Sequence, residues 1–425
     1  MELSRRILLS GVALATASTA LEKSALAASR AIELQSAVKE ALAKGSRLML
    51  PTGEFQASGI VIDAALSIEG VPGRTRITSP QGEPAFILRG PEPITLRGLS
   101  IDGGGQEGDG ALITASGATA LTIEDCFISN FGGSGLTLEG CAGRLAGNRL
   151  SAIGTAAIFA RDSKGLEISG NVIRDVGNNA IQVWTSEKTD GGAIVTRNRI
   201  ERVRADAGGT GQNGNGINIF RAGHVVVSEN RITDCMFSAV RNNAGDNCHI
   251  INNSISHMGE VAIYCEFGFE GAVVSGNIID DVALGISVTN FNEGGRLATV
   301  ANNVVRRAKG GGTLPQTNGV GIGAEGDAVV IGNVVEDTRD TGISLGWGRY
   351  SRTLSATGNI VRNTGRGIVF SMSDGADDVL IVNNRISGAQ QAIIGADHGT
   401  PVTDDLGKPG ADSPAGSVIS GNLVS

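Results

Sequence analysis

Apolar residues alternate with polar ones in short runs along most of the chain, and each run ends at a glycine or an asparagine. The stretch from Gly170 to Trp184 reads GNVIRDVGNNAIQVW, and its pattern returns in ENRITDCMFSAVRNN, NNSISHMGEVAIYCE and GNIIDDVALGISVTN. Each unit predicts an apolar strand, a Gly-Asn or Asn-Asn corner, a short strand, a polar turn and a Gly-Ile-x-Val strand. Because these strands are short and evenly spaced, the pattern leaves no length for helices between them.

An asparagine two residues before an Ile, Val or Leu marks the period, and most steps are near 23 to 27 residues. One such unit cannot bury its apolar side, whereas stacked units can, so the repeat predicts a solenoid. We expect an all-β fold, a right-handed parallel β-helix whose coils lie about 4.8 Å apart. Asparagine tolerates the left-handed conformation of a corner, and stacked amides form a ladder, so we interpret the asparagine column as structural. Its members are Asn148, Asn171, Asn198, Asn230, Asn253, Asn277, Asn303, Asn333, Asn359, Asn384 and Asn422.

Both ends of such a solenoid need covering, because an open coil exposes strand edges and core. The stretch AIELQSAVKEALAK from Ala31 to Lys44 places apolar residues at positions 34, 38, 41 and 42, and Gly45 follows. These positions lie on one face of a helix, so we predict an N-terminal capping α-helix within residues 28–50 and the β-helix over 51–425. At the other end, a loop within Ala396–Gly416 or a partner is expected to shield the last coil.

Residues 1–27 predict an export signal. Ser4, Arg5 and Arg6 precede an apolar stretch from Ile7 to Ala20, and the small-residue site Ala25-Leu26-Ala27 follows. This order is typical of a twin-arginine signal peptide, and it predicts a periplasmic or secreted protein that engages the twin-arginine export machinery. The alternatives are an ordinary secretory signal or a retained membrane anchor, although the apolar stretch is short for a membrane span. No stable membrane span is expected after cleavage.

The segment LMLPTGEF after the predicted helix, followed by LSIEG, is similar to the opening of pectate-lyase-type β-helix proteins. With the Ser4-Arg5-Arg6 signal and the GN-x-I and GI-x-V coils, nearly the whole chain resembles a bacterial family of twin-arginine-translocated β-helix repeat proteins. Pectate lyases, polygalacturonases, epimerases and carbohydrate-binding periplasmic proteins share this repeat. The resemblance implies the fold and the export route, and it implies no particular activity.

The composition suits many tight turns between strands and argues against a helical enzyme. Glycine accounts for 63 of the 425 residues, while aromatic residues make up only 4%. The formal net charge of -8 offers no basic stripe, so nucleic-acid binding is not expected. The sequence has no phosphate-binding loop, dinucleotide motif or metal-ligand spacing, and we therefore predict no cofactor and no metal.

Five cysteines occur without a Cys-x-x-Cys motif, and this spacing argues against a zinc or redox site. They are Cys126, Cys141, Cys235, Cys248 and Cys265. An odd number leaves at least one thiol unpaired in an oxidising compartment. We favour buried free cysteines that pack as small apolar residues, and a Cys126–Cys141 or Cys235–Cys248 bridge remains the alternative.

One strand of each coil predicts a row of outward side chains. In the Gly/Ala-Ile-x-Val strand the Ile and Val point inward, so the residue after each of them points outward. The outward pairs of successive coils are Gln182 and Trp184, Asn218 and Phe220, Arg241 and Asn243, Tyr264 and Glu266, and Ser287 and Thr289. Polysaccharides bind to flat rings that meet sugar CH faces, together with amides and arginine that meet hydroxyls and carboxylates. We therefore predict a polysaccharide groove along this strand stack.

Trp347 and Tyr350 lie just beyond a strand of the same kind, and Trp347 is included among the predicted substrate-binding residues. Three insertions, over residues 185–192, 204–213 and 309–318, occur near this strand and are positioned to wall a cleft. Asp280 and Asp281 follow a strand on another face, where we expect a solvated turn.

If the groove is catalytic, the candidate catalytic residues are Glu266, Arg241 and Tyr264. A polysaccharide lyase needs a base beside a cation, and Arg241 is the only cation among the outward positions of these coils. A glycoside hydrolase needs two carboxylates, for which Asp246 or Glu270 would accompany Glu266. A non-catalytic glycan-binding, envelope-structural or protein-interaction scaffold is the alternative, and the sequence does not indicate the oligomeric state.

Overall fold

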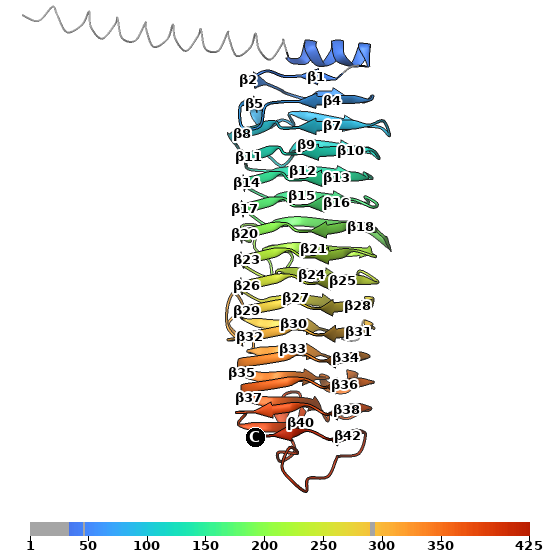
Figure 1. The fold of residues 1–425 in the computed structure, drawn as a ribbon, viewed down its shortest axis with the longest axis vertical. Helices are drawn as coiled ribbons and strands as arrows, with labels where there is room; N and C mark the ends of the chain where they lie inside the picture. Colours follow the sequence, from blue (N-terminus) through green and yellow to red (C-terminus); the bar gives the residue numbers. More distant parts are fainter. Residues whose placement is uncertain (1–33, 46, 290–293) are drawn as a thin grey trace, which may run out of the picture.

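Three walls of parallel strands wind around one axis and enclose one long core (Figure 1). The computed structural model describes residues 34–45, 47–289 and 294–425. Each coil contributes a strand first to wall A, then to wall B and then to wall C, and every strand pairs with its counterpart in the next coil. This arrangement confirms the parallel β-helix predicted from the repeat.

Wall A contains β1 (Leu48–Met49), β4 (Leu66–Glu69), β7 (Ile94–Arg97), β10 (Leu121–Glu124), β13 (Gly143–Ala146), β16 (Glu167–Ser169), β19 (Ile194–Thr196), β22 (Val226–Ser228), β25 (Cys248–Ile251), β28 (Glu270–Ser275), β31 (Arg296–Ala301), β34 (Ala328–Ile331), β36 (Leu354–Thr357), β38 (Val379–Val382) and β42 (Ser417–Ser420).

Wall B contains β2 (Gly53–Gln56), β5 (Thr75–Thr78), β8 (Ser100–Gln106), β11 (Phe127–Phe131), β14 (Arg149–Ile153), β17 (Val172–Val176), β20 (Arg199–Val203), β23 (Arg231–Cys235), β26 (Ser254–Met258), β29 (Ile278–Val282), β32 (Val304–Ala308), β39 (Arg385–Ser387) and β43 (Leu423–Val424). Two long strands, β35 (Val334–Leu345) and β37 (Ile360–Ser371), run through walls B and C.

Wall C contains β3 (Ile60–Ile62), β6 (Phe86–Arg89), β9 (Ala111–Ser116), β12 (Ser134–Glu139), β15 (Ala156–Arg161), β18 (Asn179–Asp190), β21 (Asn215–Gly223), β24 (Val240–Asn243), β27 (Val261–Glu266), β30 (Leu284–Val288), β33 (Val320–Ala324) and β40 (Gln391–Asp397). The strand β41 (Thr400–Pro401) pairs antiparallel with β40, and two 3-10 turns are η1 (Pro80–Gly82) and η3 (Gly348–Tyr350).

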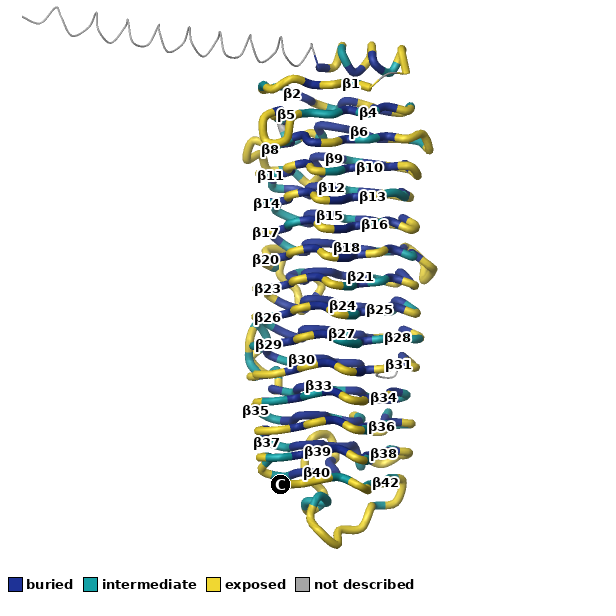
Figure 2. Tube along the Cα trace, viewed as in Figure 1, coloured by how far each residue is buried: buried dark blue, intermediate teal, exposed yellow. Residues whose placement is uncertain are grey.

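Alternation along each strand builds the core. In β18, Ile181 and Val183 are buried in the central hydrophobic cluster, and Gln182 and Trp184 lie on the opposite side of the strand. Figure 2 shows that buried segments follow the strands in coil after coil, while exposed segments gather at the turns. The walls therefore carry alternate side chains on the outer surface of a packed solenoid.

The asparagine column forms a continuous hydrogen-bonded ladder from Asn148 to Asn422. At a typical rung, the backbone N–H and the side-chain Nδ2 of Asn230 both donate to Oδ1 of Asn253, each at 3.0 Å. Asn253 in turn donates from Nδ2 to Oδ1 of Asn277 and to the Val227 carbonyl, also at 3.0 Å. The structural interpretation of this column is confirmed.

The prediction that the ladder asparagines themselves adopt the left-handed corner conformation is wrong. The left-handed residue of each corner is the one before the ladder asparagine, such as Gly170 (φ 64°), Asn252 (φ 57°) or Asn302 (φ 55°). The ladder asparagine itself turns its amide into the stack. This division of roles explains why the corners read Gly-Asn or Asn-Asn, because glycine and asparagine accept positive φ at low cost.

The N-terminal end of the core is covered by a helix over residues 34–44, as predicted. Leu34, Val38 and Ala41 are buried in the central cluster. The helix ends at Gly45, whose φ of 58° suits a C-terminal glycine cap. The predicted signal peptide, residues 1–27, lies outside the described residues, and the predicted boundaries between segments stay predictions.

The C-terminal segment folds back against the last coil. Asp405 accepts hydrogen bonds from the backbone N–H groups of Ala392, Ile393 and Gly407, at 2.9 to 3.0 Å. Leu406 packs against the core. A loop within Ala396–Gly416 therefore contacts the last strand of wall C, as the sequence suggested.

All five cysteines are free and buried, which confirms the favoured interpretation and excludes the two alternative bridges in this structure. Burial raises the pKa of the Cys126 thiol to about 12. Among residues 34–45, 47–289 and 294–425, the structure has no helix with the length and apolar character needed to span a bilayer.

Candidate binding site

The outward side chains of wall C form the two rows that the repeat predicts. In the first row, Gln182 pairs in register with Asn218, and the row continues through Arg241, Tyr264 and Ser287. In the second row, which lies two residues further along each strand, Trp184, Phe220, Asn243 and Glu266 are in register. Residues far apart in sequence are thus neighbours about 4.8 Å apart on one surface.

The second row begins with a stack of aromatic rings. The ring of Trp184 meets Phe159 edge-on at 5.2 Å and Phe220 at 5.5 Å between centroids. The indole Nε1 of Trp184 donates to Oδ1 of Asn218 at 3.3 Å. The guanidinium of Arg221 lies 4.8 Å from the centre of the Phe220 ring. The aromatic surface is therefore bordered by hydrogen-bonding groups, although both tryptophan and phenylalanine are only partly exposed.

A cavity of about 430 Å³ opens over these rows. Five of the predicted residues line it, together with Phe267 and a segment of the insertion at 204–213. The lining residues are Trp184, Thr210, Gly211, Gln212, Asn218, Phe220, Arg241, Asn243 and Phe267. Gln182 is predicted to bind substrate, but it does not line the cavity and is only 9% exposed.

Of the two insertions near this cavity, only the one at 204–213 contributes lining residues. Its Gln212 carbonyl accepts hydrogen bonds from Nδ2 of Asn179 and of Asn218, at 3.1 and 3.3 Å. The insertion at 185–192 forms the extended end of β18 and contributes no lining residue, and its Lys188 contacts the Gly268 carbonyl at 2.5 Å and Asp246 at 2.8 Å. The predicted partner carboxylate Asp246 is therefore engaged by Lys188 and does not approach Glu266 by any described contact.

Arg241 lies at the floor of the cavity in a buried ion pair. Its Nε and Nη2 donate to the two carboxylate oxygens of Glu266 at 2.6 and 3.0 Å. Asn243 donates to Glu266 Oε1 at 3.1 Å. The Tyr264 ring stacks against the Arg241 guanidinium, 5.0 Å from it. The structure therefore brings together all three candidate catalytic residues, but Glu266 is 2% exposed and is used to hold Arg241.

Sequence reasoning missed a second carboxylate in this cluster. Glu260 is 7% exposed and lies 3.4 Å from Nη1 of Arg241, and Ser238 donates to it at 3.3 Å. Glu260 stands in the turn before β27, so the alternation rule for strands does not apply to it. The signal that could have found it is its place one residue before the apolar run of β27.

Burial and ion pairing shift the pKa values in this cluster. Burial raises the pKa of the Glu260 carboxyl, and the attraction of Arg241 only partly offsets that rise. Burial, with a contribution from the charge of Glu266, raises the pKa of Tyr264 to about 12. Burial alone would lower the pKa of Arg241, but its hydrogen bond to Glu266 and the charge of Glu266 raise it. Arg241 is thus a permanent cation whose charge is compensated within the protein.

Glu260→Gln is expected to make the protein less sensitive to rising pH. The pKa of Glu260 is raised above its ordinary 4.5, so the native state holds a proton there that the unfolded chain has released. The resulting stabilisation is present below about pH 4.5 and is lost as the pH rises through the raised value. Glutamine stays neutral, so the variant should gain stability relative to the unsubstituted protein as the pH rises above about 4.5.

Urea unfolding of both proteins across this pH range measures the effect. Glu139→Gln is the matched control, because Glu139 pairs with Arg161 at an exposed position with 52% of the side chain accessible. The control should show no comparable gain, and an equal gain in both variants would contradict the assignment of the raised pKa to Glu260.

Trp347 lies in a cavity separate from that of Trp184, so the structure does not bring these two predicted substrate-binding residues together. This cavity measures about 260 Å³ and is also lined by Ser344, Arg366 and His398. The Trp347 ring meets His398 edge-on at 5.7 Å, and the tryptophan is 44% exposed. The two tryptophans are separated because six successive strand pairings along wall C lie between β18, which carries Trp184, and β35, which precedes Trp347.

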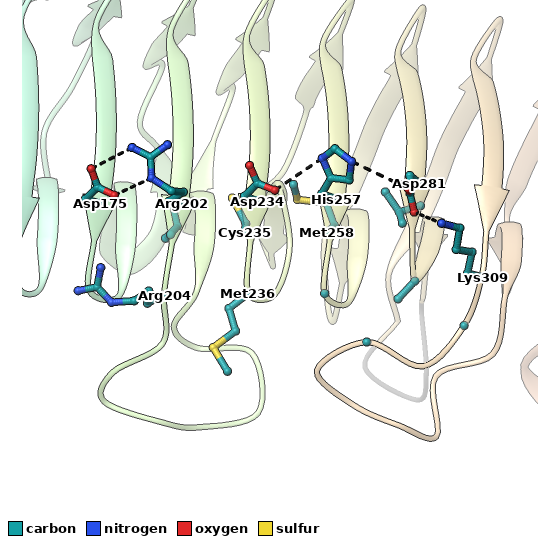
Figure 3. A pocket seen from close by; sticks show the side chains of 16 residues that line it. Asp175, Arg202, Arg204, Asp234, Cys235, Met236, His257, Met258, Asp281 and Lys309 are labelled. Atoms are coloured by element: carbon teal, nitrogen blue, oxygen red, sulfur yellow. Dashed lines mark hydrogen bonds and ion pairs between the residues drawn. The ribbon is translucent and has the colours of Figure 1, made fainter.

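A larger cavity of about 680 Å³ lies at the corner between walls B and C (Figure 3). Its rim carries ion-paired side chains from successive coils. Asp175 accepts from Arg202 at 2.6 Å, and Asp281 lies 2.6 Å from Lys309 and 3.9 Å from His257. The predicted solvated turn at Asp280 and Asp281 is wrong, because both residues lie within the strand β29. Asp281 lines this cavity, and Asp280 pairs with two arginines of the next coil.

The insertion at 309–318 also packs at this corner. The Thr313 backbone N–H donates to the Gly259 carbonyl at 2.8 Å, and its hydroxyl donates to the carbonyl of Met236. Figure 3 shows the loop that follows Lys309 beside this cavity, and Met236 over the loop that follows Arg204. The insertion at 309–318 therefore borders the corner cavity and does not wall the cavity that contains Trp184.

Within the part of the chain that the structure describes, no group of three or more His, Cys, Asp or Glu residues is arranged to hold a metal ion. The Trp184 cavity combines aromatic rings, amides and a compensated cation. Such a surface can bind an uncharged, hydroxyl-rich ligand by ring contacts and hydrogen bonds. Acid–base chemistry would require Glu260 or Glu266 to reach a ligand, and neither lines the cavity.

The chain is similar in sequence pattern and in fold to known β-helix proteins. A family model described as "Right handed beta helix region" matches residues 54–200 and 187–350. A PL6 alginate lyase in complex with a trisaccharide has a TM-score of 0.51 and 14% identity, covering 92% of this chain and 93% of that one. No curated protein matches the chain.

Two further solved structures are similar in fold. The A-module of mannuronan C-5 epimerase AlgE6 from Azotobacter vinelandii has a TM-score of 0.44 and 15% identity, covering 93% and 94% of the two chains. The catalytic domain of a GH87 alpha-1,3-glucanase with tetrasaccharides has a TM-score of 0.45 and 15% identity over 88% of this chain. The present chain spans 64% of the length of that glucanase domain. Since the family model covers more than half of the sequence, the chain belongs to the right-handed beta helix family.

Proposed function

We propose that the Trp184 cavity on wall C binds a polysaccharide of uncharged sugars and does not cleave it. The observation that carries the proposal is the joining of Trp184, Phe220, Asn218 and Asn243 in one walled cavity. Aromatic rings contact the CH faces of sugars, and amides exchange hydrogen bonds with their hydroxyls. The alginate lyase of the same fold holds a trisaccharide, which supports a carbohydrate ligand for a β-helix of this kind.

The charge pattern favours a neutral polymer over an acidic one. Arg241 is the cation at the cavity floor, and it is held by Glu266 and approached by Glu260. A uronate carboxylate would have to compete with these carboxylates for Arg241. The overall charge of -8 also repels a polyanion. Uncharged hydroxyl groups meet no such opposition.

The same contacts argue for binding without cleavage. A lyase would need an available cation and a base that reaches the sugar, whereas Arg241 is compensated and Glu266 is buried beneath it. A hydrolase would need two carboxylates facing the scissile bond. Incubation with neutral glucans, alginate and polygalacturonate should therefore yield neither new reducing ends nor unsaturated products.

Trp184→Ala is expected to lower the affinity for neutral gluco-oligosaccharides by about tenfold or more, since an aromatic contact contributes on the order of 1 kcal/mol beyond its buried area. Titration calorimetry with gluco-oligosaccharides, and with alginate as the acidic comparison, measures the change. Phe127→Ala removes an aromatic ring that is 36% exposed on wall B and should leave binding unchanged. Equal losses in both variants, or no binding by any of these glycans, would contradict the proposal, and the second result would favour a scaffold role.

We also propose that residues 1–27 direct the protein through the twin-arginine pathway to the periplasm or the medium. The support is the sequence order of Arg5, Arg6, the apolar stretch and the Ala25-Leu26-Ala27 site. Replacing Arg5 and Arg6 together by lysine should abolish export of a reporter fused to this segment, while Lys23→Gln should not. Cell fractionation measures both, and export that survives the arginine substitutions would indicate a general secretory signal.

A further inference from the structure

We infer that the Trp184 cavity and the Trp347 cavity are the two ends of one track, along which a single polysaccharide chain binds parallel to the solenoid axis. This inference rests on the proposed function and adds the shape of the ligand, which must be a chain long enough to reach both cavities.

The Trp347 cavity has the chemistry of a second sugar subsite. Trp347 is 44% exposed, and Arg366 beside it donates to Asp340 at 2.6 Å and to the Gly399 carbonyl at 3.0 Å. His398 is hydrogen-bonded to Asp397 at 2.7 Å. An exposed indole surrounded by oriented polar groups again suits a hydroxyl-rich ring. The two cavities share this character, although they are built from different coils.

Both cavities lie on wall C, and only one coil separates them. The Trp184 cavity extends to Phe267, directly after β27, and the Trp347 cavity begins at Asn318 and Val320, at the start of β33. The coil between them contributes β30. The coils that carry Trp184 and Trp347 are six parallel pairings apart, which corresponds to roughly 29 Å along the axis.

Small residues occupy the first row of wall C between the cavities, and Ser287 in this row is 9% exposed. The first row of wall C continues from Tyr264 through Ser287 and Gly323 to Ser344. A Cβ atom added at Gly323 would have the Ile286 carbonyl oxygen, at 4.0 Å, as its nearest neighbour. The position therefore faces unoccupied space, and its φ does not demand glycine. A polymer leaving one cavity meets no bulky side chain at this point of the row.

A track of this kind predicts that affinity depends on chain length. A short oligosaccharide occupies one cavity, whereas a chain that spans about 29 Å occupies both. Linking two binding events in one ligand raises the apparent affinity by about 100-fold. Affinity should therefore rise steeply at the length that first reaches the second cavity and then level off.

The experiment titrates the mature protein with neutral gluco-oligosaccharides from the disaccharide up to soluble polymer. Three proteins are compared: the unsubstituted protein, Trp347→Ala and Gly323→Ile. Isoleucine is a favourable strand residue and fills the gap without adding an aromatic or charged group. Gly323→Ile should retain the affinity for short oligosaccharides, and both variants should lose the roughly 100-fold gain for long ones. Thermal melting of each variant confirms that it is folded, and Gly323→Ile tests the track without altering either cavity.

The outcomes separate this inference from the proposed function. Binding that requires Trp184 but is equally strong for short and long chains would overturn the track and leave the proposed function intact. Long-chain affinity that survives both Trp347→Ala and Gly323→Ile would also overturn it. An absence of binding to every oligosaccharide would contradict the proposed function itself.

Discussion

Arg241→Ala is expected to lower the free energy of unfolding by about 3–5 kcal/mol at neutral pH. The substitution leaves Glu266, which is 2% exposed, and Glu260, which is 7% exposed, without their counter-charge. A buried carboxylate that loses its partner retains the full cost of its lost hydration. The substitution also removes the contact between the Arg241 guanidinium and the Tyr264 ring. Urea unfolding followed by circular dichroism measures the loss.

The loss should shrink as the pH is lowered. Without Arg241 the pKa of Glu260 loses the attraction that lowers it, so the native state binds a proton there before the unfolded chain does. Stability that depends on a raised pKa is present at low pH and declines as the pH increases. Arg161→Ala is the matched control, because its ion pair with Glu139 is 46% and 52% exposed and should contribute less than about 1 kcal/mol. A cost for Arg241→Ala no larger than that of the control would contradict the buried-pair interpretation.

Asn253→Ala is expected to cost about 3 kcal/mol or more, because it removes one rung from a buried ladder. The Asn230 N–H and Nδ2 lose the acceptor they share, and the Val227 carbonyl loses a donor. Each buried polar group left without a partner costs about 1–3 kcal/mol. Hydrogen exchange at amides of the adjacent coils should show local opening, since stability in a solenoid is a sum over neighbouring units.

Asn422→Ala is the control for the ladder, because Asn422 is the last rung and is only partly buried. It accepts from Asn384 but has no further ladder asparagine beyond it among the described residues. Its loss should cost clearly less than that of Asn253. Equal costs at the two positions would show that burial of the ladder contributes little.

Much of the fold could be predicted because the repeat is governed by two local rules. A period of two within strands identifies the outward residues of wall C, and the structure places Gln182, Asn218, Arg241 and Tyr264 in one row as expected. A period of one coil identifies the ladder asparagines. The rules concern residue position along the chain, and they hold because every strand packs against the same core.

The candidate site was predicted less completely, because depth and side-chain pairing do not follow from alternation. Glu266 faces outward as predicted, yet it is covered by its own partner Arg241. Glu260 stands in a turn, where no alternation applies, and still reaches the same guanidinium. Trp347 shares the wall with Trp184, but only the count of coils between them reveals two cavities. The paths of the insertions decide which residues line a cavity, and loop paths are not encoded by the repeat.

The register of wall C also fixes the distance between the two indoles as a whole number of coil spacings. Deleting one complete coil, the one that contains β30, would bring the two indoles closer by one coil spacing and leave the residues of both cavities unchanged. Inserting a copy of one coil would move the indoles further apart by one coil spacing. Relatives could therefore select for ligand length by gaining or losing whole turns, with no change to a single side chain that touches the sugar.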